Sequence, residues 1–244
     1  MVACFEGTRL RVGGLEVELD QSEPWEPRPG WNRLRQNRER IGSRLPLLRA
    51  LALRHLPKGS LLSLLLNQAT ETIDLTGFGK PIRSGKVAIQ EALQHLKTGW
   101  AGNSTLLQAG ATQLAGLGGG LTPAGDDFLA GVMLRAWLAH PTPDALCQLV
   151  LEAAAPRTTI LSAAFLRAAA RGECSAAWHR LFSALASGAE DQLAEPVRDV
   201  LSYGHTSGAD TLAGFLWMGH ISTHNPQRGI RPYLSSRSWA CNAR

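Results

Sequence analysis

A glycine-rich segment near the middle of the chain carries the residues with the clearest capacity for chemistry. Five of the ten residues at positions 116–125 are glycine, and Asp126 and Asp127 follow directly. Glycine costs backbone entropy on folding, so such a run indicates positive φ angles or a close approach of the backbone to another group. The apolar residues after the aspartates predict a buried helix that begins at about Asp127. Backbone N–H groups at this helix start could hold a ligand, although a tight turn with an aspartate as N-cap would explain the same pattern.

A second segment, residues 204–214, repeats the first with one residue deleted. Thr206 corresponds to Thr122, Gly208 corresponds to Gly125, and Asp210 corresponds to Asp127. In both segments the sequence Leu-Ala-Gly follows, ending at Gly131 in the first and at Gly214 in the second. We expect two buried helices related by an approximate twofold axis, crossing at the two glycines that end these triplets. The acidic helix starts would then face one cleft, and the alternative is that the aspartates serve only as helix caps.

The carboxylates limit what such a cleft can bind. Aspartates already complement the positive end of a helix, so a bare anion would be repelled there. Asp126 and Asp127 could instead hold Mg²⁺ or Mn²⁺, or accept hydrogen bonds from an amide NH₂ group. Arg157 is a candidate clamp for a carboxylate or phosphate, and His205 is a candidate proton carrier; an ordinary surface arginine and a structural histidine are the alternatives.

The predicted site therefore has three groups of residues. The candidate catalytic residues are Asp126, Asp127, Asp210 and His205. The candidate substrate-binding residues are Gly118, Gly119, Gly120, Thr122, Gly125, Arg157, Thr158, Thr206, Ser207 and Gly208. The candidate metal ligands are Asp126 and Asp127.

The elements that position these residues predict an α+β chain with a small N-terminal β-containing part and a larger helical part. Alternating apolar residues on either side of Gly13-Gly14 predict a β-hairpin. A proline-rich connector follows at 24–30, then residues with helical spacing from Trp31 to Leu45 and a short strand at Ile73 and Leu75. We expect a β-containing region over 1–83, a helical ligand-binding domain over 84–224 and a mobile basic tail over 225–244.

Glycine, proline and capping residues divide the helical part into eight predicted helices. Their expected ranges are 85–98, 104–115, 127–140, 143–155, 159–171, 175–187, 190–203 and 209–221. Pro196 is expected to bend or restart the 190–203 helix.

Composition excludes several classes of protein. The 244 residues are 44% hydrophobic and 18% charged, which is ordinary for a globular protein. No apolar run reaches the length of a membrane helix, and Glu6, Arg9 and Arg11 interrupt any signal-peptide pattern. Four scattered cysteines fit a reducing cytoplasm. The basic segments at 28–58 and 228–244 match no nucleic-acid-binding motif, so we expect neither a nucleic-acid nor a membrane partner.

The two glycine segments and the sequence Arg157-Thr158-Thr159 resemble the AllH subunit family of oxamate carbamoyltransferase. The likeness covers roughly residues 85–221, and Ala124 stands where that family is expected to have serine. The resemblance implies a multisubunit transferase of nitrogen metabolism that acts in anaerobic allantoin and purine catabolism. Such an enzyme converts oxalurate and phosphate to oxamate and carbamoyl phosphate, and its other subunits would be the partners of this chain.

Three functions remain open at this point. The first is a carbamoyltransferase subunit that takes part in catalysis, with a helical ligand-binding core. The second is a non-catalytic subunit that binds a metabolite or assists assembly by sensing a small acid. The third, a stand-alone Mg²⁺-dependent hydrolase, is disfavoured because no spaced His or Glu ligands accompany the aspartates.

Overall fold

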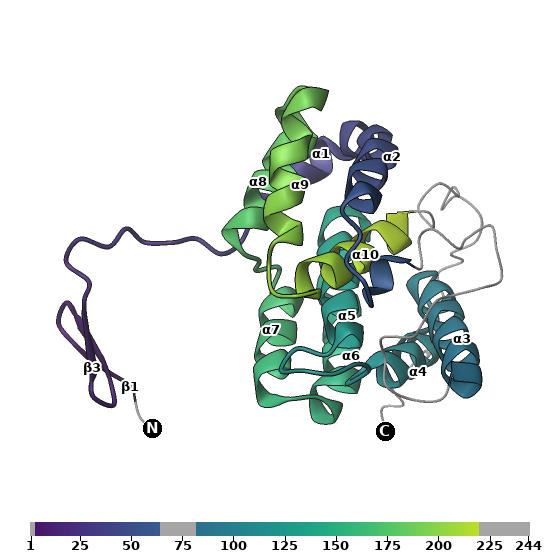
Figure 1. The fold of residues 1–244 in the computed structure, drawn as a ribbon, viewed down its shortest axis with the longest axis horizontal. Helices are drawn as coiled ribbons and strands as arrows, with labels where there is room; N and C mark the ends of the chain where they lie inside the picture. Colours follow the sequence, from purple (N-terminus) through teal and green to yellow (C-terminus); the bar gives the residue numbers. More distant parts are fainter. Residues whose placement is uncertain (1–2, 64–81, 220–244) are drawn as a thin grey trace, which may run out of the picture.

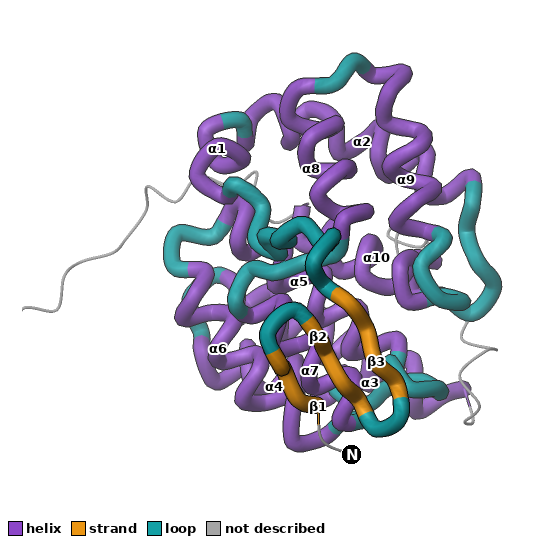
Figure 2. The backbone as a smooth tube through the Cα atoms, turned by 90° about the vertical axis from the view of Figure 1, so that its left-hand side faces the viewer, coloured by secondary structure: helices purple, strands orange, loops and turns teal. Residues whose placement is uncertain are grey.

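The chain forms a small antiparallel sheet followed by a larger body of helices, as Figures 1 and 2 show for the computed structural model, which describes residues 3–63 and 82–219. The strands are β1 (Ala3–Glu6), β2 (Arg9–Val12) and β3 (Leu15–Glu18). The helices before the glycine-rich segment are α1 (Trp31–Gln36), α2 (Arg38–Arg54), α3 (Ile82–Trp100) and α4 (Ser104–Leu114). Those after it are α5 (Ala124–Ala139), α6 (Pro143–Ala154), η2 (Ala155–Arg157), α7 (Ile160–Ala170), α8 (Ala176–Ser187), η3 (Glu190–Leu193), α9 (Ala194–Leu201) and α10 (Ser207–Gly219).

The N-terminal sheet is strongly amphipathic and lies apart from the helical body (Figure 1). Its strands pair in the order β1-β2-β3, and Leu10 lies opposite both Phe5 and Val17. The other face carries opposite charges, including an ion pair of 2.5 Å between Arg9 and Glu18. The sequence predicted the β2–β3 hairpin from its alternation; β1, which adds the third strand, was not predicted.

Helix α5 forms the centre of the helical body. Fourteen of its sixteen residues are buried, and it contacts α1, α4, α6, α7 and α10. The core around it includes the large side chains Phe128, Phe182 and Phe215. Its continuous apolar composition therefore reflects burial on all sides, as the sequence indicated.

Most predicted helices appear with boundaries within three residues. The capping residues behave as expected: the side chain of Asn103 accepts a hydrogen bond of 3.0 Å from the backbone N–H of Leu106, and Thr159 accepts one of 3.0 Å from Ser162. The predicted 190–203 helix is split into η3 and α9, a break that falls before Pro196. The proposed strand at 73–75 and the basic tail from 225 lie outside the described residues.

The start of α5 differs from the prediction in a way that matters for the site. The helix begins at Ala124 with Pro123 as its N-cap, so Asp126 and Asp127 lie within its first turn rather than capping it. Because consecutive helical residues point about 100° apart, the two aspartates face different surroundings.

In the part of the chain that the structure describes, we find no helix with the length and hydropathy needed to span a membrane.

Candidate functional site

The site is built on an unusually close crossing of α5 and α10. A Cβ atom at Gly131 would lie 1.9 Å from the carbonyl oxygen of Thr211, and one at Gly214 would lie 1.9 Å from that of Phe128. No side chain fits at these distances, so the two backbones pack directly against each other. The predicted crossing at Gly131 and Gly214 is confirmed.

Two further glycines pack the helix starts against the chain that precedes them. A Cβ atom at Gly125 would lie 2.0 Å from the carbonyl oxygen of Leu114, and one at Gly208 would lie 1.8 Å from that of Val200. The starts of α5 and α10 also touch each other, because the hydroxyls of Thr122 and Ser207 form a hydrogen bond of 2.9 Å. These contacts bring together two segments that lie 85 residues apart in the sequence.

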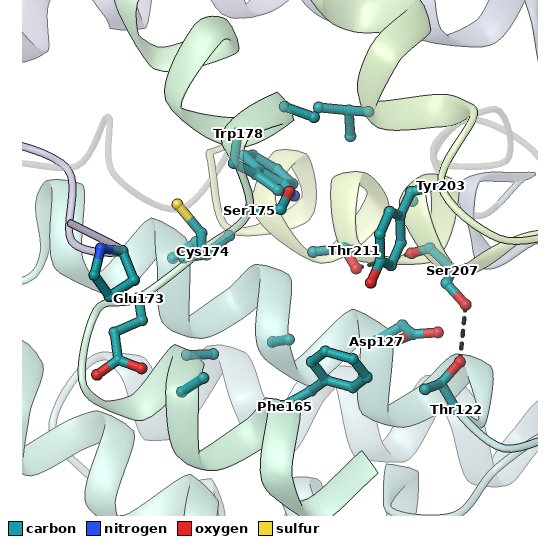
Figure 3. A pocket seen from close by; sticks show the side chains of 18 residues that line it. Thr122, Asp127, Phe165, Glu173, Cys174, Ser175, Trp178, Tyr203, Ser207 and Thr211 are labelled. Atoms are coloured by element: carbon teal, nitrogen blue, oxygen red, sulfur yellow. Dashed lines mark hydrogen bonds between the residues drawn. The ribbon is translucent and has the colours of Figure 1, made fainter. Parts of the chain in front are cut away.

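A cavity of about 270 Å³ opens beside this junction (Figure 3). Its polar lining comes from α5, α10 and the chain between α7 and α8, and its apolar lining includes aromatic side chains from α7 and α8. The residues that line it are Pro27, Thr122, Asp127, Ala130, Leu134, Phe165, Ala168, Ala169, Glu173, Cys174, Ser175, Ala177, Trp178, Val200, Tyr203, Ser207, Gly208 and Thr211. This combination of apolar walls and few polar groups is typical of a small-molecule site.

Asp127 is the polar group best placed to bind a ligand in this cavity. Its carboxylate points toward the Thr122–Ser207 pair (Figure 3), and its Oδ2 is buried without a hydrogen-bond partner among the described residues. Burial raises the pKa of Asp127 from 3.8 to about 7. The nearby carboxylates of Asp210 and Asp126 add to the rise, whereas the hydroxyls of Ser207 and Thr122 oppose it by favouring the charged form. Asp127 can therefore accept or carry a proton near neutral pH.

The raised pKa of Asp127 predicts a specific pH dependence of stability. The folded chain binds the Asp127 proton more tightly than the unfolded chain, so this contribution is complete below about pH 4 and is lost as pH rises through about 7. Relative to Asp127→Asn, we expect the free energy of unfolding of the wild type to fall by up to about 4 kcal/mol over this range. Urea unfolding of both proteins from pH 4 to pH 8 measures the difference, and parallel curves would contradict the assignment.

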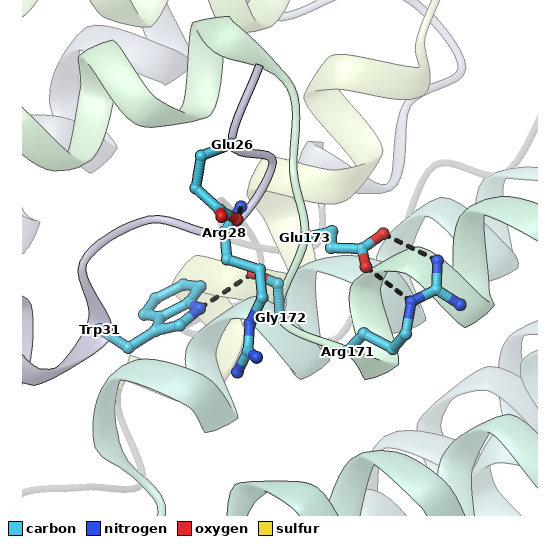
Figure 4. Close-up of polar contacts among 6 residues, drawn as sticks. All are labelled: Glu26, Arg28, Trp31, Arg171, Gly172 and Glu173. Carbon is cyan, nitrogen blue, oxygen red and sulfur yellow. Dashed lines mark hydrogen bonds and ion pairs between the residues drawn. The ribbon is translucent and has the colours of Figure 1, made fainter. Parts of the chain in front are cut away.

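The second carboxylate in the cavity lining, Glu173, is already engaged. Arg171 contacts it through two hydrogen bonds of 2.6 and 2.8 Å (Figure 4), and this guanidinium holds the pKa of Glu173 below its ordinary value. The same stretch is held by the indole of Trp31, which donates a hydrogen bond of 2.9 Å to the carbonyl oxygen of Gly172 (Figure 4). Glu173 thus closes one end of the cavity as part of a fixed ion pair.

Asp126 has a different role from its neighbour. It is 1% exposed, and its two oxygens accept hydrogen bonds from the backbone of Gly116, from Ser162 and from Thr158, the first two at 3.0 and 2.9 Å. Asp126 therefore joins the glycine-rich loop to the start of α7. It does not line the cavity.

Asp210 also faces away from the cavity. It is fully buried, and its Oδ1 accepts hydrogen bonds of 2.8 Å from the hydroxyl of Ser60 and 2.6 Å from the backbone N–H of Leu61. Burial raises the pKa of Asp210 to about 6. The two helix starts thus meet, but of the three candidate aspartates Asp127 alone lines the cavity.

The structure places the predicted site residues in two sets. Thr122, Asp127, Ser207 and Gly208 line the cavity. Outside the lining are Gly118, Gly119, Gly120, Gly125, Asp126, Arg157, Thr158, His205, Thr206 and Asp210. Arg157 and His205 have exposed side chains, and their suggested roles stay predictions.

The metal prediction also stays a prediction. Within the described residues no group of three or more His, Cys, Asp or Glu side chains is arranged to hold a metal ion. Both oxygens of Asp126 already accept hydrogen bonds, so of the two candidate metal ligands Asp127 is the one whose carboxylate has an oxygen without a hydrogen-bond partner among the described residues.

Several lining residues were missed by sequence reasoning. Trp178 and Phe165 come from helices whose own sequences indicate only core packing, so no local signal marks them. Tyr203 directly precedes Gly204, the first residue of the second glycine segment, and this position could have suggested it. Pro27 reaches the cavity because its carbonyl oxygen accepts a hydrogen bond of 2.9 Å from the backbone N–H of Cys174.

Comparison with known proteins adds one family. No solved structure matches the chain. The part of the chain covered by the family match contains every residue of the cavity lining except Pro27. Residues 114–219 match the model of the family described as oxamate carbamoyltransferase subunit AllH, which confirms the resemblance over this part of the chain.

Proposed function

We propose that this chain is a subunit of an enzyme that converts oxalurate and phosphate to oxamate and carbamoyl phosphate, in allantoin and purine catabolism. The family description supports the assignment to an oxamate carbamoyltransferase with further subunits. In this reaction a phosphate oxygen bonds to the carbamoyl carbon and the bond from that carbon to the oxamate nitrogen breaks. The proton of hydrogenphosphate balances the reaction by moving to the departing nitrogen.

The observation that carries the proposal is the unsatisfied carboxylate oxygen of Asp127 beside two hydroxyls. A carbamoyl group presents an NH₂ donor and a carbonyl acceptor on the same carbon. Asp127 Oδ2 would accept a hydrogen bond from the NH₂ group, and the hydroxyl of Thr122 or Ser207 would donate one to the carbonyl oxygen. The cavity thus has one acceptor and one adjacent hydroxyl donor, whose proton the Thr122–Ser207 hydrogen bond leaves free, for the part of the substrate that is transferred.

Asp127 could also act on the proton that the reaction transfers. A carboxyl with a pKa of about 7 exchanges its proton readily near neutral pH. The hydroxyl donor would stabilise the negative charge that develops on the carbonyl oxygen during attack by phosphate. Donors placed at this position accelerate acyl transfer most. We propose these roles for Asp127 and for the Thr122–Ser207 pair.

We further propose that the two glycine loop–helix units are related by an approximate twofold axis. The reciprocal contacts at the helix crossing support it, because Gly131 packs on Thr211 in the same way that Gly214 packs on Phe128. Gly125 and Gly208 likewise each pack a helix start onto a preceding carbonyl oxygen. The symmetry would be broken at the cavity, which Asp127 lines and Asp210 does not, since Oδ1 of Asp210 accepts hydrogen bonds from Ser60 and Leu61 instead.

The test is reconstitution of carbamoyl transfer. The full chain is combined with its partner subunits, and carbamoyl phosphate formed from oxalurate and phosphate is measured with and without it. We expect formation only when the chain is present. We also expect oxalurate to raise the unfolding temperature of the assembled complex, since a ligand stabilises the state that binds it.

Two outcomes would argue against this function. Equal formation of carbamoyl phosphate without the chain would remove it from catalysis. An assembled complex that neither forms carbamoyl phosphate nor is stabilised by oxalurate would contradict the proposed substrate.

A further inference from the structure

Exposed apolar side chains lie on the glycine-rich loop, on α7 and on the chain before α10, and two of them line the cavity. We call this set the apolar rim: Leu121 (72% exposed), Ile160 (91%), Leu161 (43%), Phe165 (44%) and Tyr203 (53%). Single exposed apolar residues are common on protein surfaces, but a group of them beside a cavity indicates an interaction site.

The members of the apolar rim are held next to one another. The hydroxyl of Thr159 donates a hydrogen bond of 2.5 Å to the carbonyl oxygen of Leu121, which ties the glycine-rich loop to the start of α7. Leu161 and Phe165 are four residues apart on α7 and therefore share a face of that helix. Phe165 and Tyr203 also line the cavity and flank Asp127 in Figure 3. The rim and the cavity thus form one continuous surface.

The described residues that line the cavity lack the positive charge that the reaction proposed above requires. Oxalurate carries a carboxylate and the second substrate is phosphate, so two anionic groups must be bound and stabilised by cations. The described residues that line the cavity include Asp127 and Glu173 but no lysine, arginine or histidine. Among the described residues, Arg171 contacts the lining through Glu173 and is neutralised by that ion pair, and Arg157 is exposed and lies outside the lining.

From these observations we infer that another subunit of the carbamoyltransferase docks on the apolar rim and places an arginine or lysine side chain over the opening of the cavity. This inference rests on the proposed function. The active site is then shared: this chain binds the uncharged carbamoyl end through Asp127, and the partner subunit binds phosphate and the oxalurate carboxylate.

The apolar rim would also strengthen the electrostatic interaction between such a cation and the anionic substrates. Apolar side chains that close around the opening exclude water, and a charge pair in a low-dielectric site interacts more strongly than one in solvent. The rim side chains would contribute to the binding energy of the interface, in which a few buried residues usually dominate.

The test uses two exposed rim positions that lie outside the cavity lining. Ile160→Asp and Leu121→Asp are each compared with Leu15→Asp, which places the same charge on an exposed apolar residue of the N-terminal sheet (63% exposed). We expect the rim variants to fold normally, because their side chains are exposed. We expect each to raise the Kd for the partner subunits at least about tenfold and to lower carbamoyl transfer in proportion, with Leu15→Asp unchanged.

A phosphate-binding measurement completes the test. We expect inorganic phosphate to bind the wild-type complex but not the isolated chain, and the Ile160→Asp variant to lose phosphate binding together with assembly. Phosphate binding by the isolated chain that disappears in Arg157→Gln would place the cation in this chain and overturn the inference.

The remaining outcomes separate the inference from the proposed function. A complex of Ile160→Asp that assembles and transfers carbamoyl groups like the wild type overturns the inference and leaves the proposed function intact. A wild-type complex that assembles through the rim without any carbamoyl transfer contradicts the proposed function. Loss of self-association of the isolated chain in Ile160→Asp, with subunit assembly unchanged, would assign the rim to a second copy and overturn the inference.

Discussion

Replacing Gly214 with alanine is expected to lower the free energy of unfolding by about 3 kcal/mol or more. The new Cβ would lie 1.9 Å from the carbonyl oxygen of Phe128 and 3.1 Å from the backbone N of Val132, so α5 and α10 would have to separate. Backbone atoms cannot turn aside as a flexible side chain can, which places this change at the severe end of overpacking. Because Asp127 precedes Phe128 on α5, the separation would also displace the site.

Gly42 provides a matched control for this substitution. It lies inside α2, where a Cβ would meet no atom within 4 Å. Glycine inside a helix is less favourable than alanine, so Gly42→Ala should raise stability by about 0.5–1 kcal/mol. Denaturant unfolding of the two variants should therefore show changes of opposite sign in the free energy of unfolding. Equal, small changes would contradict the close crossing of α5 and α10.

Asp127→Asn is expected to reduce kcat/KM for carbamoyl transfer by about 10- to 100-fold in the assembled complex. The amide cannot take up a proton, and it replaces one carboxylate oxygen with an NH₂ group that cannot accept a hydrogen bond. Losing a hydrogen bond to a charged group costs about 1.5–3 kcal/mol, and about 1.4 kcal/mol corresponds to a tenfold change in rate. The same variant should be more stable than the wild type above pH 7, because it removes the cost of burying a charge.

Asp144→Asn is the control for this loss of activity, since Asp144 is exposed on α6 and lies outside the cavity lining. We expect it to leave activity unchanged and to lower the free energy of unfolding by no more than about 1 kcal/mol, because Asp144 lies in the first turn of its helix. An Asp127→Asn complex with wild-type turnover would assign Asp127 a structural role only. Lower activity together with higher stability in Asp127→Asn would be typical of a residue that is retained for function at the expense of stability.

The sequence was sufficient for the elements that depend on local patterns. Gly131 and Gly214 stand at matching places in two apolar helices, where a missing side chain permits a close helix–helix contact, so the crossing could be expected. The alternation around Gly13-Gly14 likewise predicts a hairpin from neighbouring residues alone. Both features follow from rules that act over a few residues.

The functions of the individual aspartates could not be predicted in this way. Whether Asp126 or Asp127 faces the cavity depends on where α5 begins, and a shift of one residue rotates the helix by about 100°. It also depends on where α7 brings Thr158 and Ser162, more than 30 residues further along the chain. Asp210 matched Asp127 in sequence, yet its Oδ1 accepts hydrogen bonds from Ser60 and Leu61, about 150 residues earlier in the chain.

A crystal structure of the assembled complex with bound oxalurate tests the role of Asp127 most directly. We expect the carbamoyl nitrogen to lie within hydrogen-bond distance of Asp127 Oδ2, about 3 Å, and the carbonyl oxygen to face the hydroxyl of Thr122 or Ser207. Oxalurate bound at another place, with the cavity beside Asp127 empty, would contradict that role.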